Sequence, residues 1–189
     1  GFGYYETIAG GAGAGADWEG QDGVHTHITN TRMTDPEVLE KRYPVILHEF
    51  SIRKDSGGAG RNRGGNGCIR DIELRRPMQV SILSERRVIP PYGLAGGEDG
   101  KRGANLWVRK DATDGSTRTI SMGGKATCKM NKGDRVVIMT PGGGGYGKAG
   151  EEPLPGEFRL KEKLGAVTSR GGFRAGGSVA SREAMVTSN

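Results

Sequence analysis

Two histidines and an aspartate near the beginning of the chain, Asp22, His25 and His27, have the side chains best suited to chemistry. His25 and His27 are two positions apart, so in an extended segment they share one face with their side chains roughly 7 Å apart. Neutral imidazoles can bind a metal ion or relay protons. The alternative is that both histidines only hydrogen-bond backbone groups in a packed polar loop.

Residues that can donate hydrogen bonds surround and follow these histidines, and they could hold a carboxylate or a phosphorylated intermediate. They are Thr26, Thr29, Asn30, Thr31 and Arg32. From the whole segment we predict five catalytic residues: Asp22, His25, His27, Asn30 and Arg32. No metal site is assigned, because two histidines and one aspartate lack a third firm ligand.

The segment SGGAGRNRGGNG (56–67) resembles a loop that binds an anion through backbone N–H groups and arginines. It is not a P-loop, because GxxxxGK[ST] is absent. We predict that six of its residues contact substrate or another anion: Gly57, Gly58, Arg61, Arg63, Gly64 and Gly65. The alternative is structural, with the glycines allowing this loop to pass close to another segment.

The segment TPGGGGYG (140–147) contains four consecutive glycines. Ordering them costs much backbone entropy, so an ordered role requires a reason. Packing against a binding site or a domain interface would be such a reason, and a flexible hinge is the alternative. We add Gly143, Gly144 and Tyr146 to the predicted substrate-binding residues.

A helix and several strands must position these segments. Thr34 can cap a short helix near 35–43, with Pro36 in its first turn and Pro44 ending it. Alternating apolar residues predict strands at 46–52, 68–86, 104–110, 117–122, 125–130 and 135–140. Pro77 lacks an N–H group and should break the longest run. Turns are predicted at 114–115, 123–124 and 132–134.

Within the run 68–86, one face is apolar and the other is polar. The apolar face consists of Ile72, Leu74, Met78, Val80 and Ile82. The polar face, which we expect to meet solvent, consists of Asp71, Glu73, Arg75, Gln79 and Ser81. The sequence thus predicts an α+β fold, mostly antiparallel β with one short helix. Residues 1–150 form its structured part, and 151–189 form a weakly structured, basic, glycine-rich tail with at most one helix near 178–185.

The composition limits the size of the core and argues against some classes of protein. Glycine accounts for 35 of 189 residues, against a usual ~7%, and aromatic residues for 6%, so the core must be modest. No stretch approaches the ~20 apolar residues of a membrane-spanning helix. The start lacks the pattern of a signal peptide. It also lacks a methionine, which leads us to expect that an upstream part is missing.

The net charge of +6 is unevenly distributed. Residues 1–40 hold seven acidic residues and one arginine, a net charge of −6, and the remaining residues hold 27 basic and 15 acidic ones, a net charge of +12. The basic part is either a solvated face or a face that docks on an acidic neighbouring domain. We expect no nucleic-acid partner, because RGG-like elements and aromatic platforms are few. Cys68 and Cys128 form no CxxC pair, which fits a reducing cytoplasm.

Four blocks of sequence carry a family resemblance. They are YYETIAGGAGAG (4–15), WEGQDGVHTHITNTRMTDPEVLEKRYP (18–44), SGGAGRNRGGNGCIRDIEL (56–74) continued by ILSERR (82–87) and PYGLAGG (91–97), and TPGGGGYG (140–147). In this order they resemble the C-terminal part of the hydantoinase B half of 5-oxoprolinases and related hydantoinases. The resemblance covers residues 3–150.

This resemblance implies an ATP-dependent amidohydrolase that opens a cyclic amide, in 5-oxoprolinase 5-oxo-L-proline to L-glutamate. It implies a fragment of a larger multidomain enzyme, inactive alone and a homo-oligomer when complete. ATP and a divalent metal would bind outside this chain, ATP in a hydantoinase A-like half that is the missing partner. No membrane partner is expected. The alternatives are a hydantoinase, another lactam hydrolase or a ketone carboxylase of the same family, and a non-catalytic structural or interaction module.

Overall fold

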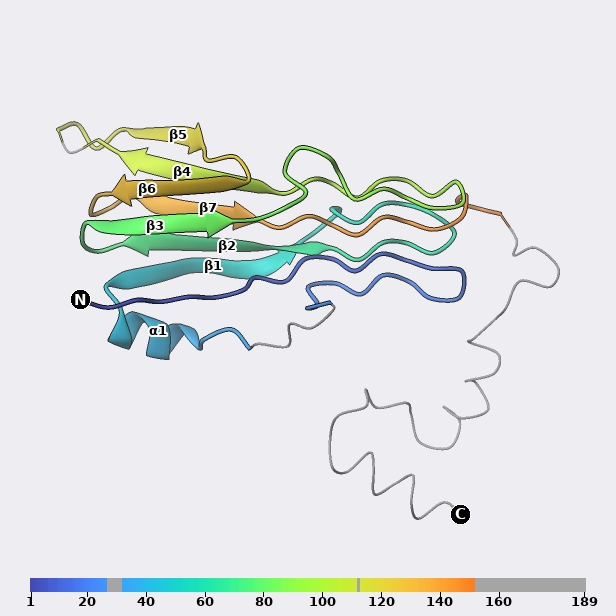
Figure 1. The fold of residues 1–189 in the computed structure, drawn as a ribbon, viewed down its shortest axis with the longest axis horizontal. Helices are drawn as coiled ribbons and strands as arrows, with labels where there is room; N and C mark the ends of the chain where they lie inside the picture. Colours follow the sequence, from blue (N-terminus) through green and yellow to red (C-terminus); the bar gives the residue numbers. More distant parts are fainter. Residues whose placement is uncertain (27–31, 112, 152–189) are drawn as a thin grey trace, which may run out of the picture. The chain divides into compact units, whose positions relative to one another are not determined.

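The computed structural model describes residues 1–26, 32–111 and 113–151. These contain one helix, α1 (Pro36–Arg42), and seven strands (Figure 1). The strands are β1 (Val45–Arg53), β2 (Gly67–Leu74), β3 (Met78–Leu83), β4 (Ala104–Lys110), β5 (Thr117–Ser121), β6 (Lys125–Met130) and β7 (Arg135–Met139). Five of them form an antiparallel sheet in the order β1-β2-β7-β4-β5, and β3 and β6 form a second antiparallel sheet. The predicted fold class is confirmed.

Pro77 divides the long alternating run as predicted. β2 ends at Leu74 and β3 begins at Met78, and the two strands belong to different sheets. The three predicted turns are also present, since Gly115, Gly123 and Gly133 all have positive φ values. The helix predicted near 178–185 lies outside the described residues.

The hydrophobic core lies between the two sheets. Leu74, Met122, Met130 and Val136 are buried together. Partly buried side chains from both sheets pack against them: Val45, Met78, Val80, Ile82, Trp107, Ala126, Cys128 and Ile138. Each fully buried apolar side chain stabilises the fold by about 1.5–3 kcal/mol relative to an exposed one. The small number of such residues agrees with the modest core expected from the composition.

The solvent-facing assignment of Asp71 is wrong. Only 4% of Asp71 is exposed, because β2 is an interior strand between β1 and β7. Its carboxylate accepts hydrogen bonds from the Arg135 guanidinium of β7. Arg70 is buried as well, with 1% exposed. Interior charges of this kind require paired partners, and both residues have them.

The N-terminal cap of α1 also differs from the prediction. Asp35, not Thr34, holds the cap position, and its side chain accepts the amide hydrogen of Glu37 at 3.0 Å. Asp35 stands directly before Pro36, which occupies the first turn and needs no amide partner. Leu39 is buried and anchors the helix, whose contacts are with β1. No helix in the described ranges has the length and apolar character needed to cross a membrane.

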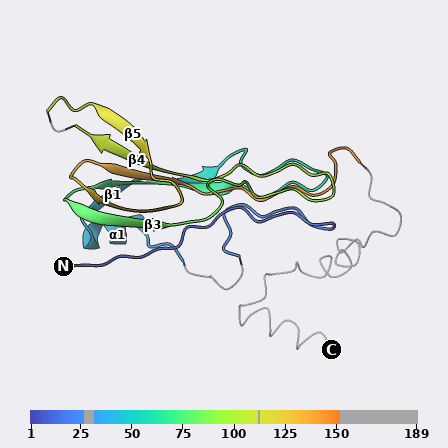
Figure 2. The same ribbon diagram turned by 45° about the horizontal axis from the view of Figure 1, so that its top comes forward.

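The glycine-rich segments lie beyond the ends of the strands and run alongside one another away from the sheets (Figures 1 and 2). Four segments take part: 10–16, 56–67, 91–100 and 140–147. We call them together the glycine bundle. Backbone hydrogen bonds join them although they form no regular strands.

Candidate functional site

Residues 140–147 are the centre of the glycine bundle, because each of the other three segments bonds to them. Ala14 donates to the Gly144 carbonyl, Gly58 to the Gly143 carbonyl and Leu94 to the Gly145 carbonyl, each at 2.9 Å. All four consecutive glycines, 142–145, are buried. The segment is therefore packed between neighbours rather than arranged as a hinge.

Side chains could not fit at most of the predicted anion-binding glycines. A Cβ atom on Gly64 would overlap the carbonyl group of Gly143, and one on Gly143 would overlap that of Ala12. The amides of Gly57, Gly58, Gly64, Gly65 and Gly143 all donate to oxygens of the chain. These N–H groups are not accessible to an anion, because chain oxygens already accept them. The geometry favours the structural alternative for these glycines, and their contact with substrate stays a prediction.

The two predicted arginines of the loop 56–67 lie in different surroundings. The Arg61 guanidinium carbon lies 5.7 Å from the ring centroid of Tyr146, within range of a cation–π contact. Tyr146 is fixed by backbone hydrogen bonds in both directions with Asn62. Arg63 instead turns toward the acidic N-terminal segment, where it donates to Asp22 at 3.0 Å.

Asp22 holds the loop 56–67 in place. Its carboxylate accepts the backbone amide of Asn66 at 2.7 Å and the Asn66 side-chain amide at 3.3 Å, in addition to Arg63. Partial burial alone would raise the pKa of Asp22, but the hydrogen bonds from Arg63 and Asn66 outweigh it and lower the pKa below its usual value. The same ion pair raises the pKa of Arg63. Asp22 is therefore an ionised structural acceptor at neutral pH.

His25 follows a short backbone bridge that fixes the chain around it. Val24 donates to the Gly10 carbonyl at 3.0 Å, and Gly23 donates to the Asn66 carbonyl at 2.8 Å. His25 itself is half-buried and makes no hydrogen bond or ion pair in the part of the chain that the structure describes. It therefore differs from Asp22, because no hydrogen bond or ion pair among the described residues holds its side chain.

The remaining predicted catalytic residues are only partly placed. His27 and Asn30 lie outside the described residues, and Arg32 is exposed at the edge of that gap. Their catalytic roles stay predictions. Within residues 1–26, 32–111 and 113–151, no three histidine, cysteine or carboxylate side chains come together as a metal site would require.

Two asparagines of the loop were missed as functional candidates, although they organise the bundle. The Asn62 side-chain amide donates to the carbonyls of Gly15 and Ala16 at 2.7 and 2.9 Å. The Asn66 side-chain oxygen accepts the amides of Ser56 and Gly57 at 2.9 and 3.0 Å. Asparagines within a glycine-rich loop are a recognisable signal, because their amide groups can replace a peptide group in hydrogen bonding.

Residues 1–149 match the protein family described as Hydantoinase B/oxoprolinase. The 5-oxoprolinase of Saccharomyces cerevisiae is 58% identical over 154 residues, which cover 78% of this chain and 12% of the yeast protein. The 5-oxoprolinase 1 of Arabidopsis thaliana is 57% identical over 146 residues, which cover 77% of this chain and 11% of the plant protein. The chain thus spans about 12% of the length of the curated relatives it matches.

A solved structure is similar in fold to this chain. The crystal structure of the ATP-dependent caprolactamase from Pseudomonas jessenii aligns with a TM-score of 0.56 and 26% sequence identity. The alignment covers 87% of this chain and 27% of the caprolactamase chain. The likeness therefore includes most of this chain but only a small part of the larger protein.

Proposed function

The chain belongs to the hydantoinase B/oxoprolinase family, and from this membership we propose that it is the C-terminal part of a 5-oxoprolinase-type amidohydrolase. The observation that carries the proposal is the identity of 57–58% to two 5-oxoprolinases. Such a level across more than three quarters of the chain supports a shared reaction more strongly than the 26% identity to the caprolactamase.

The proposed reaction converts 5-oxo-L-proline, ATP and water to L-glutamate, ADP and phosphate. ATP is needed because hydrolysis of this stable cyclic amide is unfavourable alone, and phosphorylation of the amide oxygen would create a better electrophile for water. We place the ATP site and a divalent metal ion outside this chain, with ATP in a hydantoinase A-like half. The chain alone is then inactive.

The residues of this chain would contribute in two ways. His25 is the candidate for moving a proton at the reacting amide, because it is half-buried and has no structural partner among the described residues. Asp22 would hold the loop 56–67 that supports this segment, through its bonds to Arg63 and Asn66. The glycine bundle would supply a rigid base for both.

The proposal extends to partners and location. The partners would be a small cyclic amide and the hydantoinase A-like half, in a homo-oligomer, with neither nucleic acid nor membrane. A cytoplasmic location is proposed because Cys68 and Cys128 are both free thiols.

The test is an assay of 5-oxoproline-dependent ATP hydrolysis and glutamate release, performed on this chain alone and on a full-length protein that contains it. We expect activity only in the full-length protein. Activity in the chain alone would contradict the assignment of the nucleotide site to another part. Inactivity of a folded full-length protein with 5-oxoproline, together with activity on another lactam, would replace the proposed substrate.

A further inference from the structure

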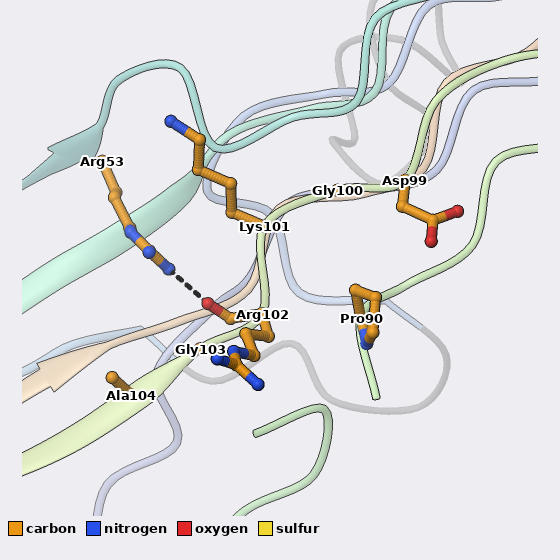
Figure 3. Close-up of a pocket in the computed structure, with 8 residues that line it drawn as sticks. All are labelled: Arg53, Pro90, Asp99, Gly100, Lys101, Arg102, Gly103 and Ala104. Atoms are coloured by element: carbon orange, nitrogen blue, oxygen red, sulfur yellow. Dashed lines mark hydrogen bonds between the residues drawn. The ribbon is translucent and has the colours of Figure 1, made fainter. Parts of the chain in front are cut away.

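An open depression lies where the five-stranded sheet meets the glycine bundle (Figure 3). Its volume is about 520 Å³. The residues that line it come from the end of β1, the approach to β4 and the loop before them: Arg53, Pro90, Asp99, Gly100, Lys101, Arg102, Gly103 and Ala104. None of them belongs to the predicted catalytic or substrate-binding residues.

Positive charge dominates this depression. Three lining residues are cationic, Arg53, Lys101 and Arg102, and only Asp99 is acidic. Asp99 is already engaged, because its carboxylate accepts the amide of Gly93 at 2.8 Å. In the described part of the chain, no carboxylate forms an ion pair with any of the three cations. A cluster of unpaired cations favours an anionic ligand.

Arg53 is held in position and still has guanidinium N–H groups that could donate to a ligand. Its Nη1 atom donates to the carbonyl of Arg102 at 2.9 Å, drawn in Figure 3, and to that of Thr140 at 3.1 Å. Its Nε and Nη2 atoms make no hydrogen bond within the described residues and are not buried. The guanidinium is thus fixed through one nitrogen and can offer the other two to a ligand.

A fourth cation, Arg87, lies beside the depression, because a Cβ atom on the lining residue Gly103 would be 2.8 Å from the Arg87 guanidinium carbon. Its three guanidinium nitrogens donate to Asn105 and to the carbonyl of Glu85, so it cannot turn away. Burial lowers the pKa of Arg87, and the charge of Arg53 lowers it further. The two guanidinium groups are therefore close enough to repel each other. An anion bound near both of them would offset that repulsion.

The backbone that carries the lysine is equally well fixed. The Lys101 amide donates to the Ser56 carbonyl at 2.7 Å, and the Lys101 carbonyl accepts the Gly142 amide at 3.1 Å. The Lys101 and Arg102 side chains are nevertheless exposed. The structure thus presents two exposed cations from a well-fixed loop, near the Arg53 guanidinium, and their side chains leave the loop in opposite directions (Figure 3).

We propose that this depression binds an oxyanion of the phosphate class through Arg53, Lys101 and Arg102. A phosphate group carries up to two negative charges and several acceptor oxygens, so it can accept hydrogen bonds from Arg53 and from a neighbouring cation together, whereas a carboxylate offers only two oxygens and one charge. The inference is independent of the proposed function, because it assigns no step of catalysis to the depression.

The test is hydrogen–deuterium exchange on the full-length protein, with inorganic phosphate compared to chloride at equal ionic strength. We expect phosphate to slow exchange in peptides that cover residues 99–104. In the double variant Lys101→Gln and Arg102→Gln, the phosphate concentration for half-maximal protection should rise about tenfold or more, because charge-assisted contacts are lost. Both side chains are exposed and unpaired, so the variant should remain folded.

A matched control is Lys132→Gln, which removes an exposed cation from the turn between β6 and β7. It should leave the phosphate effect unchanged. Pyrophosphate should protect the same peptides if the site also accepts a phosphate group carried by a larger molecule. The proposal is wrong if phosphate gives no protection, or if the double variant is protected as strongly as the natural protein.

Discussion

Asp22 and His25 are three positions apart and have different surroundings. The Asp22 carboxylate accepts three hydrogen bonds from Arg63 and Asn66, more than 40 residues away in the sequence. His25 has no such bond within the described residues. At the scale of single residues, substitution should therefore separate a structural role from a chemical one.

Replacing Asp22 with alanine should destabilise the loop 56–67 by about 1.5–3 kcal/mol, because hydrogen bonds to a charged group are lost. The measurement is the free energy of local opening, from hydrogen exchange of the Asn66 amide and its neighbours. Asp17→Ala is the control, since Asp17 lies on the same segment and has no hydrogen-bond partner in the described part of the chain. Equal effects of the two substitutions would contradict the structural role.

The same contact has a pH dependence with a defined sign. The pKa of Asp22 is lower in the folded protein than its usual value, despite partial burial, because Arg63 and Asn66 donate to the carboxylate. The stabilisation is therefore complete above the unfolded pKa of about 3.9 and is lost as the pH falls through the folded value. Asp22→Asn should remove this part of the acid sensitivity, which a comparison of local opening at neutral and acid pH would reveal.

In the full-length enzyme, His25→Ala should reduce activity and leave stability nearly unchanged, in contrast to Asp22→Ala. We expect turnover of 5-oxoproline to fall about 100-fold, as for loss of a general acid or base. The unfolding midpoint should change little, since no hydrogen bond or ion pair between described residues is lost. His48→Ala is the matched control, because His48 is an exposed histidine that pairs with Glu73 at 2.9 Å on the surface of β1 and β2. Near-normal turnover in His25→Ala would remove this residue from the chemistry.

At the scale of elements, the sequence predicted strands well and the glycine bundle poorly. In β3 and β6, more buried and exposed side chains alternate, and this local pattern can be recognised in the sequence. The contact of Gly143 with Gly65 is not local, because 78 residues separate the two glycines and neither has a side chain to indicate its neighbour. The burial of Arg70 and Asp71 could not be predicted from the sequence for a related reason. Their partners Glu6 and Arg135 are each 64 residues away in the sequence.

Two glycines in the same segment of the bundle provide a sharp test of its packing. A Cβ atom on Gly11 would overlap the backbone carbonyl of Gly65, whereas one on Gly13 would have its nearest neighbour 3.9 Å away, at the Gly144 carbonyl. Gly11→Ala should therefore cost about 1–3 kcal/mol, because backbone atoms cannot move aside easily. Gly13→Ala should be neutral or stabilise by up to about 1 kcal/mol, through the reduced freedom of the unfolded chain.

The readout is hydrogen exchange of the central segment 142–147, in which Gly143 donates to Gly65 at 2.8 Å. Faster exchange in Gly11→Ala alone would support the packing described. If the two variants behaved alike, Gly11 and Gly65 would not be in close contact.

At the scale of the whole described structure, ion pairs join the acidic N-terminal segment to the basic remainder. Glu6 binds Arg70 through two hydrogen bonds of 2.7 and 2.8 Å, and Asp22 binds Arg63. The charge imbalance seen in the sequence is therefore partly resolved inside the chain, by attraction between its two unequal parts. The opposite charges of the two parts therefore attract each other and are not available only for an external partner.

The Glu6–Arg70 pair should be the stronger of the contacts that fasten the N-terminal segment to the sheet. Only 1% of the Arg70 side chain and 15% of the Glu6 side chain are exposed, so solvent screens the pair poorly. Glu6→Gln leaves a buried guanidinium without a counter-charge and should destabilise the protein by about 3–5 kcal/mol.

Glu85→Gln is the matched control, because Glu85 pairs with Lys125 at 3.4 Å with both side chains mostly exposed. Loss of this pair should cost at most about 1 kcal/mol. The unfolding midpoints of both variants, measured at low and high salt, test the argument. A Glu6→Gln midpoint close to that of Glu85→Gln would mean that apolar packing of residues 1–9, rather than charge, holds this segment on the sheet.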